Sequence, residues 1–128
     1  MILIIKKIIA FLCNILGVSK LCFNHLNKKY NNNYVRVINY HNTEKEYIEL
    51  FDRHLTYLED KFEIIDFDTF KLFLEGKYTF KNKPGMLISF DDGFISNYEY
   101  GLDILDKHNI KALFFVYSDK QGETDPKY

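Results

Sequence analysis

The chain has 128 residues, of which 47% are hydrophobic and 17% aromatic, a composition that excludes a disordered protein and indicates a packed core. Its net charge of −1 hides an uneven distribution, because residues 1–43 contain six basic side chains and not one acidic side chain. The basic, apolar N-terminal segment (the head) is followed by a net acidic remainder (the body). This distribution favours a membrane surface over nucleic acid as a partner. The two cysteines lack Cys-x-x-Cys spacing and indicate neither a disulfide framework nor a zinc-thiolate site.

Residues 1–18 are apolar apart from Lys6, Lys7 and Asn14, and we expect them to form a helix. Its apolar run is shorter than the ~20 residues that a bilayer span needs. We therefore expect residues 1–29 to lie on a membrane surface, with lysines reaching anionic headgroups. Packing against the protein's own body and a cleaved signal peptide are the alternatives. We assign residues 1–33 to this helix and an asparagine linker, and residues 34–128 to the body.

The body alternates between β-type runs and helical patterns. Runs rich in β-branched and aromatic residues predict four strands, over residues 34–40, 62–65, 86–90 and 111–116. Apolar residues at helical spacing predict three helices between them, over residues 43–60, 68–75 and 96–108. The first and third of these helices begin with capping-box spacing, Thr43 to Glu46 and Ser96 to Glu99. The alternation predicts an α/β fold with a mostly parallel sheet.

The most informative motif is Ser89-Phe90-Asp91-Asp92-Gly93, in which an apolar strand ends in two adjacent carboxylates and a glycine. In parallel sheets and barrels, functional residues lie at the C-terminal ends of the strands. His41 follows the first strand in the same way, where it can contact a substrate or cap a turn. Phe94, Tyr98 and Tyr100 can line a sugar groove or pack in the core. These positions predict a candidate site at this end of the sheet.

The order of these motifs along the chain resembles that of the polysaccharide deacetylases, which are chitin-deacetylase-like enzymes that remove N-acetyl or O-acetyl groups from glycans. The resemblance covers about residues 35–117 and rests on five features in sequence: Ile38 to His41, Phe51 to Leu58, Phe62 to Asp66, Ile88 to Gly93 and Ala112 to Val116. It implies a hydrolase acting on an acetylated polysaccharide. It also implies a distorted (β/α) barrel, of which this chain would supply an incomplete, N-terminal half.

The resemblance further implies a divalent metal, usually zinc, at the C-terminal strand ends. The first aspartate of the family motif, here Asp91, is the general base, and the second, here Asp92, is a metal ligand. His41 is a possible substrate or site contact. The family completes its metal site with a His-Ser/Thr-x-x-His motif, and the four histidines of this chain do not have that spacing. We therefore expect a truncated chain that is inactive alone.

Two other functions compete with this hypothesis. A non-catalytic remnant or scaffold would keep the βα units without a complete metal site. The second alternative is a glycosidase or a phosphate-binding enzyme that uses the acidic pair with magnesium. The glycosidase is disfavoured because the two carboxyl groups of such enzymes lie ~5 Å or more apart, on separate elements. No glycine-rich phosphate loop is present either.

The predicted sheet and the basic head also carry expectations for the whole chain. The strand that ends at Val116 would leave an open sheet edge, so we expect the isolated chain to aggregate or to need a partner or membrane. The basic head and the family resemblance together predict a membrane-associated protein of a bacterial cell envelope. The side of the membrane stays open.

Overall fold

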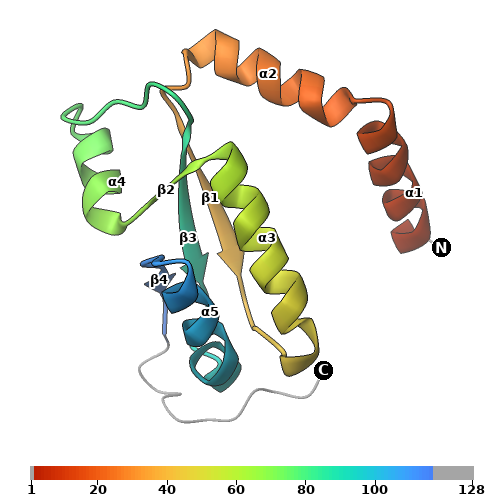
Figure 1. The fold of residues 1–128 in the computed structure, drawn as a ribbon, viewed down its shortest axis with the longest axis vertical. Helices are drawn as coiled ribbons and strands as arrows, with labels where there is room; N and C mark the ends of the chain where they lie inside the picture. The colour runs from red at the N-terminus through yellow and green to blue at the C-terminus, as the bar shows by residue number, and fades with distance from the viewer. Residues whose placement is uncertain (1, 117–128) are drawn as a thin grey trace.

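The computed structural model describes residues 2–116, and its centre is a four-stranded parallel sheet (Figure 1). β3 (Gly85–Phe90) is the central strand and pairs along its full length with β1 (Val35–Tyr40). The other edge of β3 pairs first with β2 (Glu63–Ile65) and then with β4 (Leu113–Phe114). All six residues of β3 are buried, which is typical of a parallel strand covered on both faces. The predicted α/β fold with a parallel sheet is confirmed.

Three helices connect the strands, as the periodicity predicted. α3 (Ile48–Lys61) follows a 3-10 turn at Lys45–Tyr47, and α4 (Phe67–Leu74) joins β2 to β3. α5 (Leu102–Lys107) follows a π-helical turn at Asn97–Gly101. α4 begins one residue before its predicted position, whereas α3 and α5 begin five and six residues after theirs, because an irregular turn precedes each of them.

Both predicted capping boxes are wrong. Tyr47 is the N-cap residue of α3, and Ser96 already has helical backbone angles. Thr43 is 4% exposed, and its hydroxyl donates a hydrogen bond to Asn97 Oδ1 at 3.2 Å. A tertiary partner has therefore replaced the local cap that the spacing indicated.

β4 is shorter than the predicted strand over residues 111–116. It pairs with the last two residues of β3, and one further bond joins the Phe115 amide to the Phe90 carbonyl oxygen at 2.8 Å. β3 ends at Phe90, so β4 has no ladder to follow beyond this point. The end of β3 at the acidic motif therefore also limits the length of β4.

Alternation along the strands gives the sheet two different faces. The face covered by α3 and α5 carries the larger apolar core: Phe51, Leu55, Leu58, Phe62, Met86, Ile88, Phe90, Leu105 and Ile110. On the opposite face Leu87 packs with Ile65 and Phe80, beside residues of α4. The Phe80 ring lies so close to Gly85 that a Cβ there would be 2.4 Å from it. Further along this second face the apolar residues give way to Asn39 and Ser89, which are register partners.

Residues before the sheet form two helices, α1 (Ile2–Ile15) and α2 (Val18–Tyr30), which are separated by Gly17 at a φ of 70°. α2 packs on the body, where Phe23 meets Phe62 edge to face with ring centroids 5.4 Å apart. α1 turns down from the far end of α2 and lies apart from the sheet (Figure 1). Among the described residues, no helix has both the length and the apolar character that crossing a membrane requires.

The asparagines predicted as a linker are bonded to the loop that precedes β3. Asn32 Nδ2 donates to the Lys81 carbonyl oxygen at 3.1 Å, and Asn33 Oδ1 accepts from the Phe80 amide at 3.0 Å. Asn31 and Asn32 both adopt positive φ angles, which asparagine tolerates better than most residues. The segment therefore forms an anchored turn between α2 and β1.

Candidate active site

The acidic pair lies directly after the central strand, as predicted. The Asp91 amide donates to the Tyr40 carbonyl oxygen at 2.9 Å and so continues the β1–β3 pairing by one bond. Asp92 and Gly93 then take φ angles of 68° and 64°. The left-handed region costs a residue with a Cβ roughly 1–2 kcal/mol, so a non-glycine residue there is unusual. The turn thus presents two adjacent carboxylates where the strand ends.

Asp91 is held by a short chain of polar side chains on the second face of the sheet. Asn39 Nδ2 donates to Asp91 Oδ2 at 2.5 Å, and Asn39 Oδ1 accepts from Ser89 Oγ at 2.8 Å. Ser89 is only 3% exposed. Neither Asn39 nor Ser89 was assigned a role from the sequence, although a polar residue in each of two apolar strands was a usable signal.

His41 lies beside this cluster in the chain, but its imidazole has no hydrogen bond to either aspartate within residues 2–116. The side chain is exposed, whereas its carbonyl oxygen accepts from Asn97 Nδ2 at 2.8 Å. Asn97, five residues after Asp92, is 2% exposed and was also missed. The structure therefore ties the His41 backbone to the segment that follows the acidic pair. Whether His41 contacts a substrate stays a prediction.

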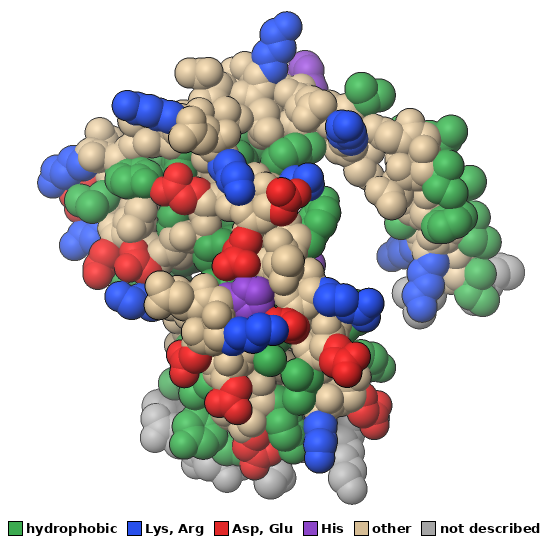
Figure 2. All heavy atoms as spheres, viewed as in Figure 1, with side chains coloured by type: hydrophobic (Ala, Val, Ile, Leu, Met, Phe, Trp, Pro, Cys, Tyr) green, Lys and Arg blue, Asp and Glu red, His purple; other side chains and the backbone are tan. Residues whose placement is uncertain are grey.

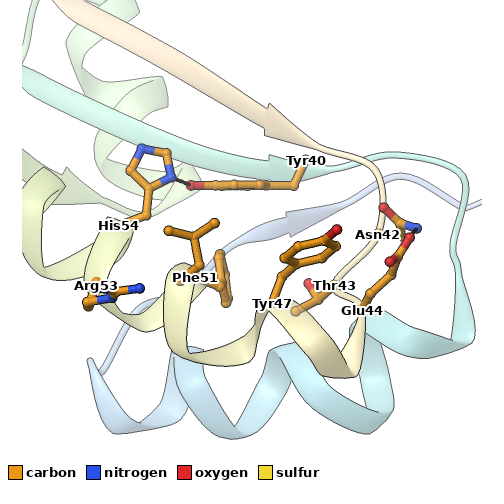
Figure 3. Close-up of a pocket in the computed structure, with 9 residues that line it drawn as sticks. Tyr40, Asn42, Thr43, Glu44, Tyr47, Phe51, Arg53 and His54 are labelled. Atoms are coloured by element: carbon orange, nitrogen blue, oxygen red, sulfur yellow. Dashed lines mark hydrogen bonds between the residues drawn. The ribbon is translucent and has the colours of Figure 1, made fainter. Parts of the chain in front are cut away.

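A larger cavity of about 550 Å³ lies at the same end of β1 but on the other face of the sheet (Figure 3). The hydroxyl of Tyr40 lies 2.8 Å from His54 Nδ1 in its wall, and burial raises the pKa of Tyr40 to about 12. Tyr40 and Asn39 are successive strand residues, so their side chains lie on opposite faces. This cavity is therefore separated by the sheet from the hydrogen bonds that hold Asp91.

A smaller apolar groove of about 240 Å³ begins at the turn itself. Its wall includes Gly93, Phe94, Tyr98 and Phe114. Tyr98 is 70% exposed and Phe94 is partly buried, so Tyr98 is not a core residue among those described. Of the two predicted roles, core packing therefore does not apply to Tyr98 within the described residues. For Phe94 and Tyr100 both roles stay open.

The described residues do not form a metal centre by themselves. Within residues 2–116 no group of three or more His, Cys, Asp or Glu side chains is arranged to hold a metal ion. Asp92 offers one carboxylate at the turn, whereas a catalytic zinc normally has three protein ligands. The described residues therefore do not supply the full ligand set of the zinc site that the resemblance implies.

Comparison with known proteins supports the family resemblance. Residues 80–127, which include the acidic pair, match the polysaccharide deacetylase family model. IcaB from Ammonifex degensii is similar in structure, with 26% identity and a TM-score of 0.63 over 71% of this chain and 41% of IcaB. The Streptococcus pyogenes deacetylase PplD, solved with acetate, has 18% identity and a TM-score of 0.58 over 73% of this chain and 48% of PplD. No curated protein matched the chain.

These findings confirm the predicted resemblance to the polysaccharide deacetylases, a family of hydrolases, and the predicted fold of that type. The likeness to PplD concerns the fold alone. The chain spans less than half the length of either solved structure. It therefore corresponds to only part of each of those structures.

Proposed function

We propose that this chain contributes the acidic motif of a polysaccharide deacetylase, which hydrolyses N-acetyl or O-acetyl groups on a glycan. One observation carries the proposal: the Asp91–Asp92 pair directly follows the central buried strand, within the segment that matches the family model. The C-terminal ends of parallel strands are where such folds place their chemistry.

In this proposal Asp91 is the general base that takes a proton from the attacking water. Its Oδ2 accepts the hydrogen bond from Asn39, so Oδ1 is the oxygen left for that proton. Asp91 is partly exposed, which gives water access to the carboxylate. His41 is proposed as a substrate contact, since it is exposed on the loop after β1.

We further propose that Asp92 is one ligand of a divalent metal, with zinc the favoured ion and with the other ligands outside residues 2–116. Isothermal titration of the chain with zinc chloride tests this assignment. Asp92→Ala should remove whatever zinc affinity the chain has, whereas Asp103→Ala on α5 should leave it unchanged. Zinc binding that is measurable in the wild type and equally strong in Asp92→Ala would contradict the ligand role.

The activity itself is tested by measuring acetate released from N-acetylated glucosamine oligomers and from O-acetylated glycans. We expect the 128-residue chain alone to release none. A chimera in which its residues 34–116 replace the matching segment of IcaB should release acetate, and Asp91→Asn should abolish that release. A folded chimera that stays inactive would favour the alternative function, a non-catalytic remnant or scaffold.

We also propose that α1 lies on an anionic membrane surface and holds the protein at a bacterial cell envelope. Figure 2 shows apolar side chains gathered along α1, with lysines beside them. Eight large apolar residues between positions 4 and 16 are about half exposed or more: Ile4, Ile5, Ile8, Ile9, Phe11, Leu12, Ile15 and Leu16. An apolar helix with lysines and no acids fits the headgroup boundary of an anionic bilayer.

Vesicle sedimentation tests the membrane proposal. The chain should sediment with phosphatidylglycerol vesicles and much less with phosphatidylcholine vesicles. Replacing Ile8 and Ile9 by glutamate should abolish sedimentation, while Leu72→Glu on α4, which is also exposed, should not. Equal sedimentation of all three proteins would overturn the assignment of the surface to α1.

A further inference from the structure

Among the described residues, only Asn39 has a side chain that connects the Asp91 carboxylate to a buried residue of the sheet. It stands opposite Ser89 in the β1–β3 register, one position before the sheet ends. Its amide bonds in two directions, to Asp91 Oδ2 at 2.5 Å and to Ser89 Oγ at 2.8 Å. Asn39 is itself exposed, so its order comes from these two bonds and not from burial.

We propose that Asn39 is a positioning residue for Asp91, a role that rests on the function proposed above. The ionised Asp91 carboxylate only accepts, so the Asn39 amide turns Nδ2 toward it and Oδ1 toward the Ser89 hydroxyl. Ser89 Oγ is also 3.4 Å from the Ile38 carbonyl oxygen, so this hydroxyl has two acceptors within reach. Its donation to Asn39 Oδ1, the shorter of the two contacts, stabilises this orientation of the amide.

A bond to Nδ2 fixes the Asp91 side chain because an amide N–H is a donor and an ionised carboxylate only accepts. One carboxylate oxygen is engaged and the other is held in a single direction. Without this bond, nothing else among the described residues donates to the Asp91 side chain. Asn39 therefore selects one rotamer of the base before any substrate is present.

The test is an NMR measurement of the Asp91 χ1 angle in the 128-residue chain, from the three-bond couplings of its carboxyl carbon to the backbone nitrogen and carbonyl carbon. The wild type should show one rotamer. Asn39→Ala should average the couplings, and Ser89→Ala should do so in part because Asn39 then keeps only its bond to Asp91. Asn42→Ala, which removes an exposed amide after the same strand, should leave one rotamer.

A single Asp91 rotamer in Asn39→Ala would overturn the proposal, as would averaging in the wild type or equal averaging in Asn42→Ala. These couplings do not depend on activity, so they decide the question even if the chain deacetylates nothing. In the active IcaB chimera, Asn39→Ala should lower kcat on the order of 100-fold with KM nearly unchanged, because it misplaces the base without removing it. A change confined to KM would contradict the positioning role.

Discussion

The side-chain amide of Asn97 donates a hydrogen bond from Nδ2 to the carbonyl oxygen of His41 at 2.8 Å, across 56 positions of sequence. The same side chain accepts from the Thr43 hydroxyl at 3.2 Å, and only 2% of Asn97 is exposed. Gly101 lies against this pair, since a Cβ there would be 3.2 Å from Thr43 Oγ1. The turn after the acidic pair thereby fixes the loop that follows β1.

Asn97→Ala should destabilise the protein by about 1–3 kcal/mol, because it leaves the Thr43 hydroxyl and the His41 carbonyl group without their partner. Urea unfolding followed by circular dichroism measures the free energy of unfolding. Glu99→Ala changes an exposed residue of the same π-helical turn and should alter it by less than about 0.5 kcal/mol. Equal effects of the two substitutions would show that the Asn97 bonds contribute nothing of their own.

Asp92 combines a proposed function with an unfavourable backbone angle. Its φ of 68° disfavours any side chain, and β-branched ones most. Asp92→Val should therefore unfold more easily than Asp92→Gly, by about 1–2 kcal/mol. Both lack the carboxylate, so their zinc affinities should be equally low. Urea unfolding of the two variants gives the comparison, and equal stability would mean that the turn relaxes when Asp92 is replaced.

Gly93 is restricted by its surroundings as well as by its backbone. A Cβ there would lie 2.8 Å from Val116 Cγ1, at a φ of 64°. Gly76 has a φ of 70° and no atom within 4 Å of the same position, so it separates the two effects. Gly93→Ala should cost about 1–3 kcal/mol more than Gly76→Ala, owing to the steric clash. If thermal unfolding shows that Gly93→Ala and Gly76→Ala lower the stability equally, Val116 does not restrict the turn.

Much of the fold could be predicted because its signals are local. An apolar run that ends in Asp91 and Asp92 is informative without knowledge of its neighbours, and α4 ends where Gly76 permits a positive φ. The pairing of β1 with β3 is not local, because β2 lies between them in sequence. The Asn39–Ser89 contact follows from that strand order and its register, so single-strand patterns could not reveal it.

The wrong capping boxes have a related cause. The spacing of Thr43 and Glu46 is a pattern of neighbours, while the Thr43 hydroxyl is taken by Asn97 from a distant part of the chain. Ser96 is buried, and its hydroxyl has no hydrogen-bond partner among the described residues. Tertiary packing thus decided both positions against the local preference.

His108 joins α5 to α3 through both nitrogens of its ring. Nδ1 lies 2.8 Å from Glu59 Oε2, and Nε2 lies 2.8 Å from Asp52 Oδ1. Because carboxylates only accept, both ring nitrogens must donate, and the ring is then the imidazolium cation. Burial alone would lower the pKa of His108, but the hydrogen bonds and charges of Asp52 and Glu59 raise it above the ordinary 6.5.

This arrangement predicts a pH-dependent contribution to stability. The pKa of His108 is raised in the folded state, so the folded protein binds the proton more tightly than the unfolded chain does. The stabilisation is complete below the unfolded-state pKa of 6.5 and is lost as the pH rises through the higher folded-state value. Urea unfolding should therefore show a stability difference between the wild type and His108→Gln that is largest near about pH 6 and shrinks toward about pH 9. His25→Gln, an exposed position on α2, controls for loss of an imidazole. A difference between the wild type and His108→Gln that stays constant over this range would mean that His108 is held by packing and not by its charge.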